Sequence, residues 1–427
     1  MRCAGSPTQE LNESTSHTAK PIFWFCSCIS ISFIIYSVNR VAKPEQSLNF
    51  ALFFFAYYGY VGIFSPYASL FFEERGLSAA QIGVLMSLLQ VMRIFGPNVW
   101  GWVADHRSQR VAVLRVTSLA AVISFCGMFF GQTFAYFFAV MVIVNLFTSA
   151  QGPLSEALML SAMRGDLTHY GRLRLWGSVG FIFSVMAAGQ LLDWYSVELM
   201  PWLALIMLAM VSVVTLRMRE EAPIVHRSDS PSVMSVLRKR EVWSFFTSTF
   251  LMVAAHASLY VYYSLYLSQI GYSKTVIGLM WSLGVIAEII FFFYQEPLFK
   301  RFGVKNLMFI SLAIGVIRFL MIAFGAQSLV LLLIAQVLHA ATFGVHHSSS
   351  VATLQRWFSG PLQARGQALF ISISYGLGGT LGGLLLSACW DTFGAQLVYV
   401  IAALMSGCGL VAAVLSYRWQ IRDGEIK

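Results

Sequence analysis

The sequence predicts an all-α membrane protein with twelve transmembrane helices, arranged as two six-helix halves that repeat each other in parallel. Three observations lead to this prediction. The chain is 58% hydrophobic and only 11% charged over 427 residues, whereas soluble domains carry about 25% charged residues. It also contains a series of apolar segments of about 20 residues, the length that a helix needs to cross a bilayer. Finally, two parts of the chain match each other at one constant offset.

Twelve apolar segments are long enough to cross the membrane as helices. Their connections are short, apart from residues 218–243, which carry Pro223, Pro231 and mixed charge. We therefore predict an N-terminal half at 49–217, a cytoplasmic linker at 218–243 and a C-terminal half at 244–427. The predicted spans are 49–72, 79–102, 111–130, 134–161, 172–192, 199–217, 244–268, 274–295, 306–325, 328–352, 364–388 and 394–417.

Residues 1–48 form an N-terminal extension whose role the sequence leaves open. Within it, residues 21–38 are apolar and are followed by Arg40 and Lys43. This stretch would suit a thirteenth membrane segment, a signal-like segment or an upstream extension from a misassigned start. A signal peptide fits less well, because the apolar run is long and no small-residue cleavage site follows it.

The basic residues explain the net charge of +9 as a feature of membrane topology. Only Arg75 and Lys274 lie in the loops after predicted helices 1, 3, 5, 7, 9 and 11, whereas the other side holds twenty of the 28 Lys and Arg residues. By the positive-inside rule, that basic side and the C-terminus are cytoplasmic. Because the basic residues form no long run, we predict no nucleic-acid partner. The 6 Cys residues show no metal-ligand spacing, and we predict neither a metal nor a cofactor.

The two halves align at an offset of 195 residues. Gly76–Gly83 falls on Gly271–Gly278 without a gap, and Tyr67 falls on Tyr262. Parallel six-helix repeats joined by a linker are typical of transporters whose halves rock about a central site.

Charged side chains inside the predicted spans indicate where function lies. A charge near the middle of the bilayer costs about 2.5–3.5 kcal/mol on insertion scales, so such residues usually face a cavity. Arg93 and Glu288 occupy equivalent positions of the repeat, and we treat them as a candidate ion pair across the interface. The simpler alternative is that buried ion pairs only orient the helices. The ionisable residues at or near span interiors are Arg93, Glu156, Arg174, Glu288, Arg318, His256, His339, His346 and His347.

Several of these residues share a helix face with other polar residues. Such a face suits a water-filled path, although small residues also serve plain helix packing. A histidine that faces a cavity can move protons, whereas one on an apolar face is more often a packing residue. A metal site formed by the helix 10 histidines lacks a carboxylate or thiolate partner. The faces are Asn145, Ser149, Gly152 and Glu156 on helix 4, His256, Tyr260 and Tyr263 on helix 7, and Gln336, His339, Phe343, His346 and Ser350 on helix 10.

The loop after predicted helix 2 carries a recognisable motif. Gly101-Trp-Val-Ala-Asp105-His-Arg-Ser-Gln-Arg110 resembles the G-x-x-x-D-R-x-G-R-R loop of the major facilitator superfamily. The resemblance implies the fold of that superfamily and a gating role for Gly101, Asp105 and Arg110. His106 and Ser108 depart from the pattern.

Two further segments resemble the proton symporter branch that contains the 3-phenylpropionic acid transporters and lactose permease. They are Tyr170-Gly-Arg-Leu-Arg174-Leu-Trp-Gly-Ser-Val-Gly180 and the stretch from Tyr272 to Glu288. Glu156 precedes Arg174 by 18 residues, as the substrate-site acid and arginine do in lactose permease. The resemblance therefore implies substrate binding by Glu156 and Arg174, and a substrate and proton network of Glu288, Arg318 and His339.

The proton carrier must differ from that of lactose permease, because Thr342 stands where that permease has a carboxylate and Gln336 where it has a lysine. We favour Glu288 as the carrier, since burial deep in a span favours the neutral form of an acid. His339 is the second candidate. An aromatic carboxylate would suit Arg174 or Arg93 through bidentate hydrogen bonds.

These observations predict a proton-coupled symporter that imports a small organic solute, with an aromatic carboxylate such as 3-phenylpropionate as the first candidate. We expect Tyr260, Trp281 and His256 to complete the substrate site. The expected partners are the solute, protons and the lipid bilayer of a bacterial inner membrane, and the expected functional unit is a monomer. Alternatives are a sugar or nucleoside symporter, or a drug efflux transporter of the same fold. An enzyme is not expected, because no hydrolase motif occurs, and the internal repeat disfavours a channel or receptor.

Overall fold

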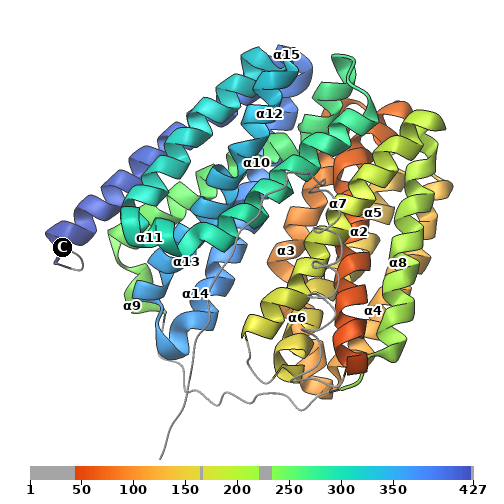
Figure 1. Ribbon diagram of the computed structural model, residues 1–427, viewed down its shortest axis with the longest axis horizontal. Helices are drawn as coiled ribbons and strands as arrows, with labels where there is room; N and C mark the ends of the chain where they lie inside the picture. The colour runs from red at the N-terminus through yellow and green to blue at the C-terminus, as the bar shows by residue number, and fades with distance from the viewer. Residues whose placement is uncertain (1–43, 164–166, 221–232, 425–427) are drawn as a thin grey trace, which may run out of the picture. The chain divides into compact units, whose positions relative to one another are not determined.

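The computed structural model describes residues 44–163, 167–220 and 233–424. All regular secondary structure in these ranges is helical (Figure 1). Residues 44–217 form α2 (Pro44–Glu74), α3 (Ala79–Arg107), α4 (Arg110–Phe125), η1 (Cys126–Phe129), α5 (Phe134–Thr148), α6 (Gln151–Ala162), α7 (Leu167–Trp194), η2 (Val197–Leu199) and α8 (Met200–Arg217). Residues 234–422 form α9 (Met234–Leu237), α10 (Arg240–Gln269), α11 (Lys274–Gly325), α12 (Leu329–Val337), η3 (Ala340–Val345), α13 (His346–Trp357), η4 (Gly360–Leu362), α14 (Gln363–Phe370), η5 (Ile371–Gly378) and α15 (Gly379–Arg422).

Ten described helical segments are long and apolar enough to cross a membrane. Two of them, Lys274–Gly325 and Arg365–Arg422, contain 52 and 58 residues and are long enough for two crossings each. Each breaks at a glycine with positive φ: Gly303 has φ 74° and ψ 156°, and Gly394 has φ 77° and ψ 173°. A side chain would be strained in this backbone conformation. The ten segments therefore supply twelve crossings, which confirms the predicted fold class.

The helices differ from the predicted spans in detail. Predicted helix 4 is interrupted between α5 and α6, and predicted helices 10 and 11 contain the π-helical segments η3 and η5. The charged end of α3 continues to Arg107 and α10 begins at Arg240, beyond the predicted limits. Hydropathy detects only the part of a helix that lies in hydrocarbon, whereas the backbone hydrogen bonds continue into water.

Two predicted features fall partly or wholly on residues that the structure does not cover. Residues 21–38, the candidate extra membrane segment, lie outside the described residues. In the predicted linker, residues 221–232 also lie outside them, while α9 is a short helix that we did not predict. Its Val236 is only 9% exposed and packs in an apolar cluster with Val242 and Phe245 of α10.

The internal repeat is visible at the turns that precede α3 and α11. Gly76 and Gly271 both have positive φ, at 79° and 98°. Ser78 and Ser273 then adopt nearly the same extended backbone, and the side chain of each accepts a hydrogen bond from the backbone of the third residue after it. Such serine caps satisfy free amides at a helix N-terminus. Equivalent residues of the two halves therefore form equivalent helix starts.

The two groups of six crossings meet at these same helix starts, which we call the joined end. α7 packs against α11, and α3 packs against α15 and η5. Figure 1 shows residues 44–217 gathered on one side and residues 240–424 on the other. The Tyr67 hydroxyl donates to the Lys274 carbonyl at 3.1 Å, and the Tyr262 hydroxyl donates to the Ala79 carbonyl at 3.1 Å. The repeat equivalents Tyr67 and Tyr262 therefore each reach the helix start of the opposite group.

Candidate functional site

One polar cluster lies among the first six crossings, where α2, α6 and α7 bring Tyr58, Glu156 and Arg174 together. Arg174 Nε lies 3.4 Å from Glu156 Oε1, and Arg174 Nη2 donates to the Tyr58 hydroxyl. The guanidinium also lies over the Tyr58 ring, 4.0 Å from its centroid. Gly177 makes room for this arrangement, because a Cβ there would lie 2.6 Å from Cδ2 of Tyr58. Glu156 and Arg174, both predicted to bind the substrate, are thus in contact, and their side chains remain 38% and 31% exposed.

A second polar cluster lies among the last six crossings. His339 Nε2 lies 2.7 Å from Glu288 Oε1, and the two side chains are 12% and 15% exposed. Arg318 is only 1% exposed. Its Nε donates to the Ala335 carbonyl at 2.8 Å and its Nη1 donates to the Thr342 hydroxyl at 3.1 Å. The three residues that resemblance assigned to the proton network, Glu288, Arg318 and His339, are therefore brought to one region.

Both ring nitrogens of His256 have hydrogen-bond partners, and one of these belongs to the second cluster. Nδ1 lies 2.8 Å from the Met252 carbonyl, and Nε2 lies 3.3 Å from the Thr342 hydroxyl. Because a carbonyl only accepts, Nδ1 carries a proton, so Nε2 is an acceptor in the neutral ring; the single proton of the Thr342 hydroxyl can point to it or to the His339 carbonyl, 3.2 Å away. The His256 and His339 rings are 5.8 Å apart between centroids. Thr342 thus links Arg318 to His256.

Arg93 differs from the other buried arginines in its partners. Its Nη1 donates to Gln90 Oε1 at 3.1 Å, one turn earlier on α3. The structure places Glu288 against His339 and shows no ion pair between Glu288 and Arg93 within the described residues. The predicted pair across the interface is therefore not observed. Arg93 is instead close enough to interact electrostatically with tyrosines of both groups of crossings, namely Tyr57, Tyr58, Tyr260 and Tyr375.

Aromatic side chains connect the two groups of crossings near these charges. The Trp281 ring stacks at 6.3 Å and 28° on Tyr260, whose ring lies 6.5 Å from that of His256. Across the interface, Trp281 lies 6.5 Å from Phe181 of α7. The Trp281 indole nitrogen donates to Ser264 Oγ at 3.0 Å, which fixes the ring. The predicted substrate residues His256, Tyr260 and Trp281 thus form one aromatic row.

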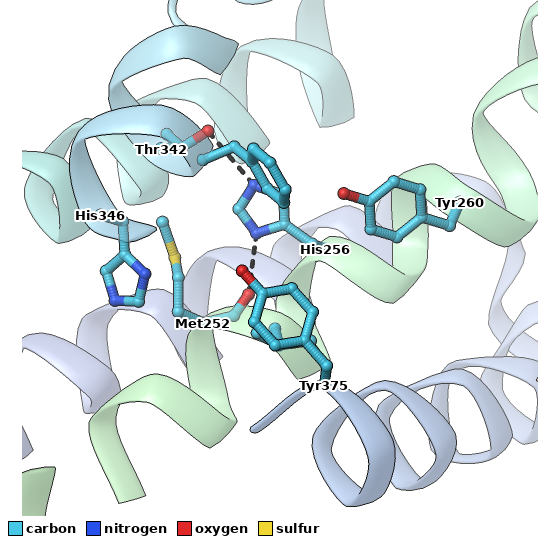
Figure 2. Close-up of a pocket in the computed structure, with 8 residues that line it drawn as sticks. Met252, His256, Tyr260, Thr342, His346 and Tyr375 are labelled. Atoms are coloured by element: carbon cyan, nitrogen blue, oxygen red, sulfur yellow. Dashed lines mark hydrogen bonds between the residues drawn. The ribbon is translucent and has the colours of Figure 1, made fainter. Parts of the chain in front are cut away.

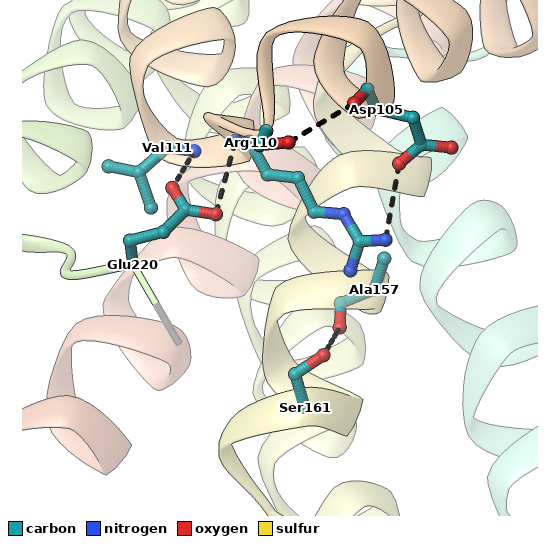
Figure 3. A network of polar contacts seen from close by, with 7 residues as sticks. Asp105, Arg110, Val111, Ala157, Ser161 and Glu220 are labelled. Atoms are coloured by element: carbon teal, nitrogen blue, oxygen red, sulfur yellow. Dashed lines mark hydrogen bonds and ion pairs between the residues drawn. The ribbon is translucent and has the colours of Figure 1, made fainter. Parts of the chain in front are cut away.

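The loop motif after α3 forms a polar network at the end of the helices away from the joined end. Arg110 Nη2 donates to Asp105 Oδ1 at 3.2 Å (Figure 3). Glu220 accepts hydrogen bonds from the backbone nitrogens of Arg110 and Val111, at 3.1 and 2.8 Å, and so caps the start of α4. A Cβ at Gly101 would meet no atom within 4 Å. Asp105 and Arg110 are therefore paired with each other, and Glu220 is an additional member that the sequence did not suggest.

The sequence matches proteins of a known family. The sequence model of the MFS_1 like family matches residues 47–401. The chain belongs to the major facilitator superfamily. Members are transporters, so this chain is an integral multi-pass membrane transporter of a small molecule and not an enzyme.

Several relatives of this facilitator are known. It is 30% identical over 306 residues to a protein of Escherichia coli (strain K12) named "Probable 3-phenylpropionic acid transporter", covering 70% of this chain and 80% of that protein. It is 27% identical over 388 residues to the maltose permease of Geobacillus stearothermophilus, covering 88% and 96%. The crystal structure of the nucleoside transporter NupG shares the fold, with a TM-score of 0.78 and 19% identity over 87% of this chain and 99% of that chain.

Two residues of this facilitator's polar clusters were not selected from the sequence. Tyr58 could have been suspected, because Tyr57 and Tyr58 place two adjacent hydroxyls within an apolar run of predicted helix 1. Thr342 was noted only as a departure from lactose permease, yet it joins Arg318 and His256. Within the described residues, no group of three or more His, Cys, Asp or Glu side chains is arranged to hold a metal ion.

Proposed function

We propose that this facilitator is a proton-coupled symporter that imports a small organic anion, with an aromatic carboxylate such as 3-phenylpropionate as the first candidate. The observation that carries the proposal is the contact between Glu288 and His339 at 2.7 Å, beside the buried Arg318. The named E. coli relative supports the choice of solute. In this proposal the end with Asp105 and the C-terminus face the cytoplasm of a bacterium, and the monomer is the functional unit.

Glu288 and His339 form a pair that can hold one exchangeable proton. The proton can reside on the imidazole, which gives an ion pair, or on the carboxylic acid, which gives a neutral hydrogen bond. The first form places two charges in a region of low dielectric and the second places none. Both forms have no net charge, whereas loss of the proton leaves one buried negative charge, so proton binding from one side and release to the other would change the charge at the centre of the transporter in each cycle. Because the solute is an anion, one proton carried with one solute moves no net charge, so the pH gradient and not the membrane potential would drive accumulation, by about tenfold for each pH unit.

Arg93 is the best candidate to bind the carboxylate of the solute. Arg174 is engaged by Glu156 and Tyr58, and Arg318 donates to Ala335 and Thr342 while 1% exposed. Arg93 has only the neutral Gln90 as a hydrogen-bond partner in the described residues. A guanidinium without an acidic partner can form a bidentate pair with a carboxylate.

The aromatic row offers a place for the ring of the solute. Tyr260 and Trp281 of this row come from the last six crossings, and Phe181, which lies beside Trp281, comes from the first six. A solute held by Arg93 on α3 and by this row would contact both groups of crossings. Relative rocking of the groups would then change its contacts, as alternating access requires.

A second candidate solute is a nucleoside or sugar. The fold match with the nucleoside transporter NupG and the similarity to maltose permease favour it. Glu156 and Arg174 also offer a half-exposed pair of acceptors and donors for hydroxyl groups. Under this alternative Glu156 and Arg174, and not Arg93, would supply most of the binding free energy.

Uptake of labelled 3-phenylpropionate into bacterial cells tests the proposal. We expect accumulation in cells that express the protein, loss of accumulation with a protonophore, and competition by other aromatic acids. Cells with an empty vector provide the background. Competition by maltose or a nucleoside, without competition by aromatic acids, would favour the second candidate. Uptake that is unaffected by a protonophore would contradict proton coupling.

A further inference from the structure

A small pocket opens beside the second polar cluster. It is lined by residues of α10, η3, α13 and η5, among them His256, Tyr260, His346 and Tyr375 (Figure 2). The space amounts to about 240 Å³ including the part that opens outward, while the enclosed part has room for one water-sized group. In the view of Figure 2, His256 lies between His346 and Tyr260.

His346 lines this pocket and carries an unsatisfied polar atom on its ring. The residue is 4% exposed, and its buried Nε2 has no hydrogen-bond partner within the described residues. Two of the neighbouring polar residues have partners: His256 bonds to Met252 and Thr342, and the Tyr375 hydroxyl lies 2.9 Å from His347 Nδ1. A buried polar atom without a partner costs about 1–3 kcal/mol. A group that fills the pocket and bonds to His346 would remove this cost.

Two irregular helical segments form the wall of the pocket. Thr342 and Phe343 belong to the π-helix η3, and Tyr375 belongs to the π-helix η5. π-helical turns are rare and occur frequently at functional sites, because the extra residue redirects side chains. Their presence on two neighbouring crossings at the same pocket indicates that it is a built feature of the fold.

The pocket lies within range of the proposed anion site. Tyr260 and Tyr375 line the pocket, and both are close enough to Arg93 to interact with its charge. A molecule bound to Arg93 therefore has the pocket within reach at its far end. The aromatic side chains of Tyr260 and Phe343 are part of its lining.

We propose that this pocket receives a hydroxyl group of the transported solute, at the end opposite its carboxylate. The hydroxyl would bond to the imidazole of His346. The preferred substrate class is then a hydroxyphenyl-substituted carboxylate, and not the unsubstituted aromatic acid. This inference rests on the proposed import of an organic anion and adds the identity of its distal group.

Competition binding to the purified protein tests this inference independently of proton coupling. The probe is labelled 3-phenylpropionate, and the competitors are unlabelled 3-phenylpropionate and its 3- and 4-hydroxyphenyl counterparts. We expect at least one hydroxylated acid to bind about fivefold to tenfold more tightly, as one additional hydrogen bond would give. His346→Phe, which keeps a ring of similar shape but removes both nitrogens, should abolish this preference. His346→Gln, which restores a polar group at similar reach, should recover part of it.

Phe343→Leu provides a matched control in the same pocket, since it alters packing without removing a hydrogen-bonding group. It should weaken the binding of all three competitors equally and leave the ratios of their affinities unchanged. A thermal unfolding curve for each variant checks that it folds. Equal affinities of the acids in the unchanged protein, or a preference that survives His346→Phe, would overturn the inference even if 3-phenylpropionate is imported. If none of the acids binds, both the assignment of an aromatic acid substrate and this inference are wrong. If the acids bind but uptake is not sensitive to a protonophore, only the proposal of proton coupling is wrong.

Discussion

The carboxylate of Asp193, at the end of α7, accepts hydrogen bonds from the backbone nitrogen and the hydroxyl of Thr275, at 2.8 and 2.6 Å. Its other oxygen accepts from the backbone nitrogen of Lys274 at 2.8 Å. In the opposite direction, Asp391 of α15 accepts from the backbone nitrogen of Ala80 at 3.2 Å. Ala80 and Thr275 are equivalents in the 195-residue repeat. An acid from each group of crossings therefore caps a helix start of the other, where free amides and the helix dipole favour a negative charge.

Removing the stronger of these caps should loosen the joined end. Asp193→Ala deletes all three hydrogen bonds, and loss of a helix cap costs about 1 kcal/mol, or about a fivefold shift toward separation of the two groups. Spin labels at Glu74 and Gln327 would report the distance between the groups at this end. Asp391→Ala removes one longer hydrogen bond and should shift the distribution less. An equal or larger effect of Asp391→Ala would show that the hydrogen bonds of Asp193 do not hold this end together.

A side chain at Gly83 should separate the groups more strongly. A Cβ there would collide with Ser387 Oγ and with the Tyr262 hydroxyl, both on the opposite group. Gly83→Ala should therefore disfavour the joined arrangement, because the side chains of Ser387 and Tyr262 are short or rigid and cannot easily move away. The same pair of labels measures the effect. Gly407→Ala is the control on α15, which also carries Ser387, since its Cβ would meet only Val316 Cγ2 at an ordinary contact distance of 3.7 Å, and it should leave the distances unchanged.

Neutralising Glu288 should uncouple transport from protons. Glu288→Gln keeps a hydrogen-bonding group beside His339 but cannot release a proton. We expect no accumulation of 3-phenylpropionate against its gradient, while exchange of internal for external solute continues. Counterflow into vesicles measures exchange without a proton gradient. Loss of both activities would assign Glu288 to binding or folding instead of coupling.

The fold could be predicted because lipid imposes one solution on the backbone. Every segment in hydrocarbon must pair its own amides and carbonyls, so apolar length alone reveals helices. The two longest helices confirm this, since the predicted breaks between spans fall close to Gly303 and Gly394. The distribution of Lys and Arg predicts orientation, and that assignment stays a prediction.

The partners of the buried charges could not be predicted in the same way. The 195-residue offset shows that Arg93 and Glu288 occupy equivalent positions in the two halves. Equivalent residues are in contact only if they lie near the symmetry axis that relates the halves. Glu288 instead meets His339, which lies just before the π-helix η3. The caps were missed for a related reason: Asp193 and Asp391 are 198 residues apart, so an ungapped offset of 195 does not align them.

Arg93 should determine affinity for the negative charge of the solute. Arg93→Ala removes a charged hydrogen-bonding group, and we expect about 10-fold to 100-fold weaker binding of 3-phenylpropionate. Arg93→Lys keeps the charge but not the bidentate geometry, so its affinity for the acid should fall between those of the unchanged protein and Arg93→Ala. The neutral amide of the same acid is the control ligand, and its weaker binding should not depend on Arg93. A parallel loss for acid and amide would indicate a general distortion of α3.

Tyr58 should act on transport through Arg174. Tyr58→Phe removes the hydroxyl that accepts from Arg174 Nη2 but keeps the ring under the guanidinium. Tyr58→Leu removes both contacts. Because a cation over an aromatic ring contributes about 0.5–1 kcal/mol at exposed sites, the two variants should differ by about threefold in apparent KM for uptake. Under the aromatic-acid proposal, both variants should change the apparent KM less than Arg93→Ala does. A larger change for Tyr58→Leu would assign the main binding site to Glu156 and Arg174, as a sugar or nucleoside substrate requires.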